Sequence, residues 1–232
     1  MEAALDLLGE QDVLADIGCD HGFFFAAALK RGLCRSVIAS DISAPSLEKA
    51  RRLAEKEELT GRIEFRCCDG FVGFTPGEAT GAALLGIGGE LIVSILKRGK
   101  DAAQSFGRIV MQPMRGEAEL RQYLYENGYA VRDEAVVFDA GRYYQLIAVN
   151  YAPDEAAALP PDWPEGYYQF GPVALEKREP ELLPMLNRYK AVMDRKLAAA
   201  ARNGSIPPAL TREAECTKRI IGLCTARTED SQ

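Results

Sequence analysis

The sequence of 232 residues predicts an α/β fold, in which a mostly parallel seven-stranded sheet is followed by an α-helical hairpin. Short apolar runs alternate with helical segments five times, which is typical of a parallel sheet with crossover helices. Two strands then follow one another directly, joined by a turn at residues 139–142, and they predict one antiparallel strand at the end of the sheet. Beyond residue 180, apolar residues recur at three and four positions in two long segments.

Each element is placed by its own apolar run or periodicity. The seven strands are predicted at residues 13–17, 36–41, 62–66, 82–85, 108–111, 129–138 and 143–150. The helices are predicted at residues 23–29, 44–56, 90–97, 117–127, 181–202 and 210–227. Ser43 is a suitable N-cap for the second of these helices. A break at residues 204–208 separates the last two helices and makes them a hairpin.

The charge is distributed unevenly along the chain, and it divides the chain into three parts. Residues 1–150 carry a net charge of −5 and form the predicted domain. Residues 151–171 carry −4 and four prolines, which predicts a Pro-rich linker. Residues 172–232 hold the helical hairpin and tail, and the stretch 172–227 has a net charge of +5. A basic segment on an acidic protein suggests a polyanionic partner, although solvated helix faces produce the same balance.

Composition narrows the class of protein further. We expect no membrane segment, because no apolar run approaches the roughly 20 residues that span a bilayer. The chain start lacks the features of a signal peptide. Six cysteines without C-x-x-C spacing and a single histidine argue against a zinc site, so no metal is expected. Reduced cysteines fit a cytoplasmic protein. The oligomeric state is left open.

The first strand ends in a turn that carries an acid and glycines. Asp16, Gly18 and Gly22 precede the first predicted helix, whose free N–H groups suit a carboxylate or phosphate. Glycine permits the sharp turn and lets a ligand approach the backbone. The turn is therefore either a cofactor cradle or a tight strand–helix connection. Because Asp41 and Asp69 end the next two strands, and ligands bind at this edge of parallel sheets, the repetition favours a cofactor site.

The residues of the first turn also distinguish between cofactors. The dinucleotide fingerprint G-x-G-x-x-G has a glycine where this chain has Asp20, and a carboxylate would repel a pyrophosphate. S-adenosylmethionine fits better, because it carries a sulfonium and an ammonium group and no phosphate. Asp16 would hold the ammonium group, Asp41 the ribose hydroxyls, and Asp69 the exocyclic amine of adenine.

Five short motifs resemble one known family. They are residues 16–21 (DIGCDH), 68–70 (CDG), 86–92 (GIGGELI), 111–113 (MQP) and 169–172 (QFGP). Together they resemble the bacterial tRNA (adenine(22)-N1)-methyltransferases over about residues 6–202. Ile87 and Met114 depart from that family's usual methionine and asparagine. The resemblance implies a Rossmann-like class I methyltransferase fold that uses S-adenosylmethionine to methylate N1 of an adenine in tRNA.

The predicted site residues fall into three groups. The cofactor-binding residues are Asp16, Gly18, Cys19, Gly22, Asp41, Ile42, Cys68, Asp69, Gly70, Gly86, Ile87 and Gly88. The predicted catalytic residues are Asp20 and, second to it, His21, because neutral adenine already has a lone pair on N1 and a carboxylate stabilises the cationic product. The predicted substrate contacts are Phe23, Gln112, Pro113, Lys177, Arg178, Arg188, Lys190, Arg195, Lys196 and Arg202.

Two alternative functions remain open at this point. A small-molecule methyltransferase would have an enclosed pocket and no need for the basic hairpin. A non-catalytic RNA-binding protein that retains the fold would bind tRNA without the cofactor.

Overall fold

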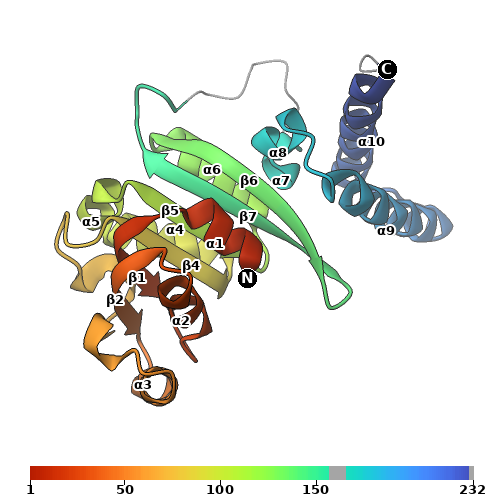
Figure 1. The fold of residues 1–232 in the computed structure, drawn as a ribbon. Coiled ribbons are helices and arrows are strands. Elements are labelled where there is room, and N and C mark those ends of the chain that lie inside the picture. The colour runs from red at the N-terminus through yellow and green to blue at the C-terminus, as the bar shows by residue number, and fades with distance from the viewer. Residues whose placement is uncertain (157–165, 230–232) are drawn as a thin grey trace. The chain divides into compact units, whose positions relative to one another are not determined.

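The structure is a computed structural model that describes residues 1–156 and 166–229. The described residues form two compact units (Figure 1). The first consists of residues 1–135 and 145–156, and the second of residues 136–144 and 166–229. The tip of the last β-hairpin therefore packs with the C-terminal helices, whereas the sequence predicted a domain of residues 1–150.

The seven-stranded sheet is confirmed. Its strands are β1 (Gln11–Ile17), β2 (Cys34–Asp41), β3 (Ile63–Cys67), β4 (Gly81–Ile87), β5 (Arg108–Pro113), β6 (Tyr129–Asp139) and β7 (Arg142–Tyr151). They lie in the order β3-β2-β1-β4-β5-β7-β6, with β1 to β5 parallel and β7 antiparallel to β5. This order brings the carboxyl ends of β1, β2 and β3 side by side.

One detail of the predicted sheet was wrong. The reversed strand, β7, lies one place inside the edge, and β6 forms the edge itself. The reason is the burial of each strand. Residues 145–149 of β7 are all buried, as an inner strand requires, whereas β6 carries the exposed Arg132, which suits an edge.

Helices pack against the sheet in the first unit. They are α1 (Glu2–Leu8), α2 (Phe23–Lys30), α3 (Ala44–Lys56), α4 (Gly89–Arg98), α5 (Lys100–Ser105) and α6 (Glu117–Glu126), with 3-10 turns η1 (Thr60–Arg62) and η2 (Gly70–Gly73). The sequence did not predict α1 or α5, which are short. Ser43 caps α3 as predicted, because its Oγ accepts the Ser46 N–H at 3.3 Å. Buried residues of α4 to α6, among them Ile92 and Leu120, share one core with the sheet.

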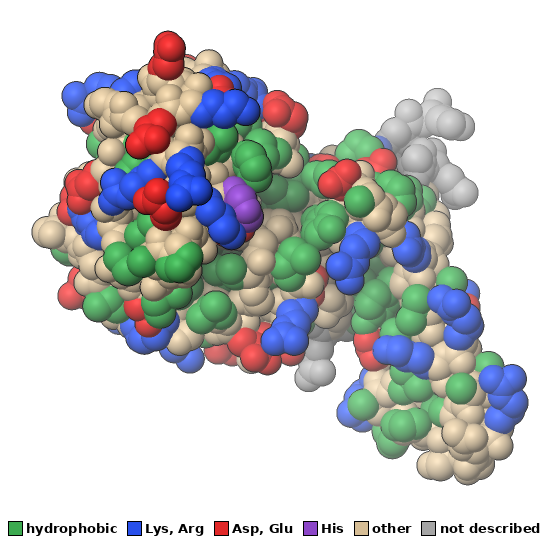
Figure 2. Space-filling model, turned by 90° about the horizontal axis from the view of Figure 1, so that it is seen from below, with side chains coloured by type: hydrophobic (Ala, Val, Ile, Leu, Met, Phe, Trp, Pro, Cys, Tyr) green, Lys and Arg blue, Asp and Glu red, His purple; other side chains and the backbone are tan. Residues whose placement is uncertain are grey.

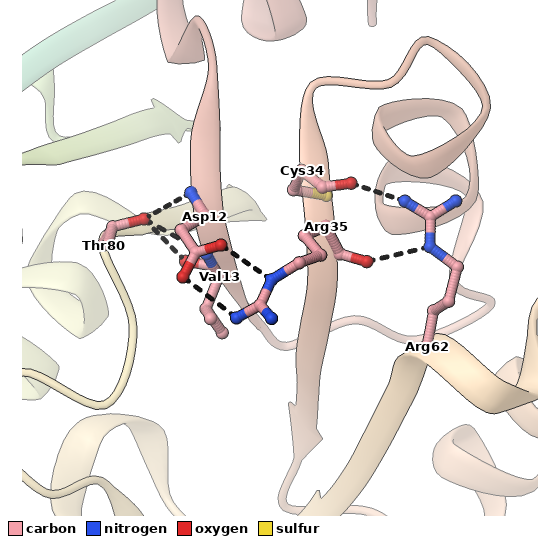
Figure 3. A network of polar contacts seen from close by, with 6 residues as sticks. All are labelled: Asp12, Val13, Cys34, Arg35, Arg62 and Thr80. Carbon is pink, nitrogen blue, oxygen red and sulfur yellow. Dashed lines mark hydrogen bonds and ion pairs between the residues drawn. The ribbon is translucent and has the colours of Figure 1, made fainter.

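The amino ends of the strands are closed by a polar network (Figure 3). Thr80 Oγ accepts the N–H groups of Asp12 at 2.9 Å and of Val13 at 3.2 Å. The Arg35 guanidinium donates to both carboxylate oxygens of Asp12, at 2.8 and 3.1 Å. Arg62 donates to the carbonyls of Arg35 at 2.8 Å and Cys34 at 2.6 Å. The amino ends of these strands are therefore held together by hydrogen bonds and an ion pair between protein groups.

A buried ion pair joins α6 to the last two strands. Arg121 donates to Glu134 Oε1 at 2.6 Å and to Gln145 Oε1 at 2.8 Å, and all three side chains are buried. Removing one partner of such a pair leaves an uncompensated buried charge. The sequence analysis did not predict this buried ion pair.

The second unit contains the predicted helical hairpin. Its helices are α7 (Tyr167–Phe170), α8 (Pro172–Glu176), α9 (Leu182–Arg202) and α10 (Pro208–Glu229). Val136 of the β-hairpin tip shares a hydrophobic cluster with Phe170, Leu186 and Ile220. The predicted linker of residues 151–171 differs from the structure at both ends, because β7 continues through Tyr151 and the buried aromatic residues of α7 belong to this cluster. Its three later prolines lie outside the described residues.

Candidate active site

A buried carboxylate lies at the end of β1. Asp16 is 3% exposed, and the backbone N–H of Phe25, in the first turn of α2, favours the charged form of its carboxyl group and so lowers its pKa. Its Oδ2 atom has no hydrogen-bond partner among the described residues. Burial, and secondarily the charge of Asp41, raises the pKa of Asp16 to about 7. A buried acceptor without a partner is costly, and an ammonium group at Oδ2 would satisfy it.

The turn after Asp16 folds back on β2. The N–H groups of Gly18 and Cys19 both donate to the Ser40 carbonyl, at 2.8 and 3.0 Å. Gly22 has φ of 79°, and a Cβ there would come within 2.4 Å of the Phe25 ring, so this position requires glycine. Burial raises the pKa of the Cys19 thiol, which keeps it protonated. The turn therefore shapes a backbone cradle beside Asp16.

Asp41 connects the ends of the first two strands. Its Oδ1 accepts the Ser43 N–H at 2.8 Å, and its Oδ2 accepts the Asp20 N–H at 3.2 Å. Each carboxylate oxygen has a further lone pair for a ligand. The next residue, Ile42, is a large apolar side chain that is 72% exposed.

Asp20 and His21 form a surface pair at the same turn. His21 Nδ1 lies 2.5 Å from Asp20 Oδ2, and Lys49 Nζ lies 3.8 Å from Asp20 Oδ1. Asp20 has φ of 41°, a left-handed conformation that the Asp41 contact helps to hold. The His21 ring stacks on Phe23, with centroids 5.6 Å apart, and Phe23 is 57% exposed. Figure 2 shows the single histidine at the molecular surface.

The end of β3 carries Asp69, which is already paired. Arg98, in the last turn of α4, donates to both oxygens of the Asp69 carboxylate, at 2.6 and 2.8 Å. Cys68 is half-buried, and burial raises the pKa of its thiol. Gly70 has φ of 58° and lies against Ile95 of α4. Asp69 was predicted from the sequence and Arg98 was not, because no local pattern links residues 29 positions apart.

The glycine-rich loop after β4 is fastened to the end of β5. Gly86 has φ of 74°, and its N–H donates to Gln112 Oε1 at 3.1 Å. The Ile87 carbonyl accepts the Met114 N–H at 2.9 Å. A Cβ on Gly89 would come within 2.3 Å of the Gly116 carbonyl oxygen, so two loops meet here without a side chain between them.

Three other predicted site residues lie on these strand ends. Ile87 packs against the core and is only partly buried. Gly88 is the N-cap residue of α4 and has Arg115 beside it. Pro113 is buried at the end of β5. The structure thus shows that Gln112 holds the glycine-rich loop, a role that the sequence did not predict.

The predicted basic substrate contacts lie in the second unit. Arg188, Arg195, Lys196 and Arg202 are exposed on α9. Lys177 is paired with Glu179 at 3.1 Å, and Lys190 with Asp194 at 2.6 Å, so part of the predicted positive charge is neutralised locally. Arg178 has φ of 57°. Figure 2 shows Lys and Arg side chains along the helical hairpin. Among the α10 residues whose exposure the structure describes, three further cations are exposed and were not among the predicted contacts, namely Arg212, Lys218 and Arg219.

Two further observations bear on the class of protein. None of the helices in the described part of the chain combines the length and apolar character that crossing a bilayer requires. Within residues 1–156 and 166–229, no three His, Cys, Asp or Glu side chains are grouped as metal ligands would be.

The carboxylates at three neighbouring strand ends and the glycine cradle lie at the carboxyl ends of the parallel strands, where open α/β sheets bind ligands such as nucleotides. The model of the methyltransferase domain family matches residues 1–147, and the chain belongs to this family.

Individual relatives are similar over different lengths. The chain is 32% identical over 145 residues to the tRNA (adenine(22)-N(1))-methyltransferase of Bacillus subtilis, which is 62% of this chain and 61% of that protein. The sequence alignment thus spans about three fifths of that relative's length. Among solved structures, the B. subtilis m1A22 tRNA methyltransferase TrmK has a TM-score of 0.78 at 22% identity, over 97% of this chain and 95% of that one. M. capricolum TrmK, in complex with S-adenosyl-homocysteine, has a TM-score of 0.72 at 20% identity, over 98% and 96%.

Proposed function

We propose that this protein is an S-adenosylmethionine-dependent methyltransferase that methylates N1 of an adenine in tRNA, at position 22 by similarity to the B. subtilis enzyme. The observation that carries the cofactor is the buried Oδ2 of Asp16, which has no partner among the described residues. Similarity to the B. subtilis tRNA methyltransferase supports the substrate. On this proposal the protein acts on tRNA in the cytoplasm.

The residues at the strand ends fit this cofactor. Asp16 would accept a hydrogen bond from the α-ammonium group, whose charge also offsets the cost of the buried carboxylate. Asp41 would accept the ribose hydroxyls with the lone pairs that its backbone contacts leave free. Ile42 offers an exposed apolar surface for the flat face of the adenine, and Asp69 an acceptor for its 6-amino group. When bound, the sulfonium supplies the electrophilic methyl group.

Methylation of the target base requires no proton transfer to generate the nucleophile. Adenine N1 has its own lone pair, so the reaction depends on alignment and on stabilising the positive charge that the base gains. Asp20 is exposed on the cofactor turn, and its contacts with His21 and Lys49 fix where its carboxylate lies. Phe23 presents an exposed ring to an unpaired base, with His21 stacked on it. We assign Asp20 to the charge on the adenine and His21 to holding Asp20.

Because N1 lies on the Watson–Crick edge, a paired target adenine must leave its partner before it reacts. The exposed cations of α9 would bind phosphates of the folded RNA, and the exposed Phe23 would stack on the released base.

The direct test is mass-spectrometric mapping of methylated nucleosides after incubation of unmodified tRNA with the protein and isotope-labelled cofactor. We expect one 1-methyladenosine per tRNA. Methylation of another nucleoside or of small molecules only would support a small-molecule or different tRNA methyltransferase. Binding of tRNA without any binding of the cofactor would support a non-catalytic RNA-binding protein. Either result would overturn the proposal.

Asp20→Asn separates catalysis from cofactor binding. Asparagine adopts the positive φ of this position more readily than alanine does. We expect turnover to fall by roughly 100-fold, with cofactor affinity near the wild-type value. An equal loss of turnover and affinity would make Asp20 part of the cofactor cradle and would contradict the catalytic assignment.

The basic helix is tested by changing Arg188, Lys190, Arg195 and Lys196 together to glutamine. The affinity for tRNA should fall, and the slope of log affinity against log salt should flatten by up to about 0.9 for each phosphate that is no longer neutralised. Cofactor affinity should stay unchanged. Unchanged tRNA affinity and salt slope would show that these side chains are only a solvated helix face.

A further inference from the structure

A two-pronged ion pair at the carboxyl ends of the strands involves Arg98, which has no role in the proposed function. Arg98 holds Asp69 through two hydrogen bonds of 2.6 and 2.8 Å, one to each carboxylate oxygen. Both side chains are 43% exposed, so the pair is open to a ligand. Two parallel bonds from a planar guanidinium fix the plane of a carboxylate, which a single point charge does not.

Helix α4 holds the same corner of the chain at a second point. Gly70, directly after Asp69, has φ of 58° and lies so close to α4 that a Cβ would come within 2.6 Å of Ile95 Cγ2. Ile95 is buried and precedes Arg98 by three residues, so both lie on one face of the helix. The backbone at Asp69 is thus set by packing, and the side chain of Asp69 is set by Arg98.

An exposed ion pair of this kind adds little to stability. Its effect is on orientation. The guanidinium occupies one lone pair of each oxygen and leaves the others free, so the carboxylate can still accept a hydrogen bond. The paired carboxylate also presents no net charge to a neutral base.

We propose that Arg98 is a positioning residue that aims the Asp69 carboxylate at the 6-amino group of the cofactor's adenine, and so makes this protein select 6-amino over 6-oxo purines. This inference rests on the proposed function, because it assumes that the cofactor lies at the ends of β1 to β3. Arg98 is the last residue of α4, and no sequence pattern connects it with recognition of the cofactor.

The test compares two ligands by calorimetry. S-adenosylhomocysteine carries the 6-amino group, and S-inosylhomocysteine carries an oxygen in its place, which is an acceptor and repels a carboxylate. In Arg98→Met, affinity for S-adenosylhomocysteine should fall about tenfold, and affinity for the 6-oxo compound should stay the same or rise, so that the selectivity collapses. Arg98→Lys restores the charge without the two-pronged geometry and should recover only part of the selectivity.

A matched control exists at the amino ends of the strands. Arg35 binds both oxygens of Asp12 with similar geometry, so Arg35→Met breaks an equivalent pair and should leave both affinities unchanged. Thermal unfolding of each variant checks that it is folded.

Equal losses for both ligands in Arg98→Met, no loss for either, or full recovery of selectivity in Arg98→Lys would each overturn the assignment. If the wild-type protein binds neither ligand, the proposed function itself fails, which is distinct from a wild-type protein that binds S-adenosylhomocysteine without help from Arg98.

Discussion

The amino ends and the carboxyl ends of β1 and β2 in the first unit differ in whether every buried polar side chain has a partner in the described part of the chain. At the amino ends of the strands, Thr80, Arg35 and Arg62 bind neighbouring backbone groups and a carboxylate (Figure 3). At the carboxyl ends, Asp16 keeps a buried oxygen without a partner among the described residues, and Ile42 is exposed to solvent. The contacts at the amino ends stabilise the fold. At the carboxyl ends, that oxygen of Asp16 destabilises the free protein, and a bound ligand that donates to it would remove that cost. Substitutions at the two ends of the strands should therefore separate stability from binding.

Asp16→Asn should have the largest effect on binding. The substitution removes the negative charge that holds the ammonium group, and cofactor affinity should fall by about 100-fold. The same change should stabilise the free protein above pH 7, because it removes the cost of ionising a buried carboxylate. Calorimetry and thermal unfolding measure the two effects. A loss of stability together with affinity would show that Asp16 serves the fold.

The pH dependence of binding follows from the same carboxylate. The pKa of Asp16 is raised to about 7 from about 3.8, so below pH 7 the free protein holds a proton that must leave before the ammonium group binds. Affinity should fall by up to about tenfold for each pH unit below 7, with proton release detectable by calorimetry in two buffers.

Stability of the free protein should move in the other direction. The folded state binds this proton more tightly than the unfolded state, so the stabilisation is full below about pH 3.8 and is lost as the pH rises through 7. Asp16→Asn should lack this component of both pH profiles. Identical profiles in the variant would assign the titration to another group.

Asp41→Ala should weaken cofactor binding by about 1.5–3 kcal/mol, the value of charge-assisted hydrogen bonds to the ribose. The variant also frees the Ser43 and Asp20 N–H groups, so its folding must be checked by thermal unfolding. Unchanged affinity in a folded protein would remove Asp41 from the site.

Local sequence patterns were sufficient to predict which residues lie at the ends of the strands. Asp16, Asp41 and Asp69 each lie at or just beyond the end of a predicted strand, and parallel strands bring their carboxyl ends to one side of the sheet. The short helices α1 and α5 were missed because seven and six residues are too few for a clear helical period. The order of β6 and β7 depends on burial of each whole strand, which alternation alone does not determine.

Contacts between distant residues were beyond the sequence patterns. Arg98 pairs with Asp69 across 29 positions, and Gln112 holds Gly86 across 26. Neither contact has a local motif, because both depend on how β4, β5 and α4 pack. The unsatisfied Oδ2 of Asp16 is likewise a property of the folded state, seen among the described residues, and it is the observation on which the cofactor proposal depends.

At the amino ends, Thr80→Val should lower the free energy of unfolding by about 1 kcal/mol, because the Thr80 hydroxyl accepts two backbone N–H groups of β1. Cofactor affinity should not change. Chemical denaturation with calorimetry on the same samples measures both quantities. A loss of affinity would show that the two ends of the strands are coupled, and the contrast between them would fail.

Arg35→Met should have the smallest effect. Its pair with Asp12 has two-pronged geometry, yet Arg35 and Asp12 are 75% and 57% exposed, so water competes for both groups. We expect the free energy of unfolding to change by about 0.5 kcal/mol or less, and less still at high salt, which screens exposed charges. Chemical denaturation at low and high salt measures this. The Arg98–Asp69 pair has the same geometry, but there we expect its loss to change ligand selectivity. A large loss of stability in Arg35→Met would mean that such pairs stabilise this fold. Arg98 would then have to be interpreted as a structural residue as well.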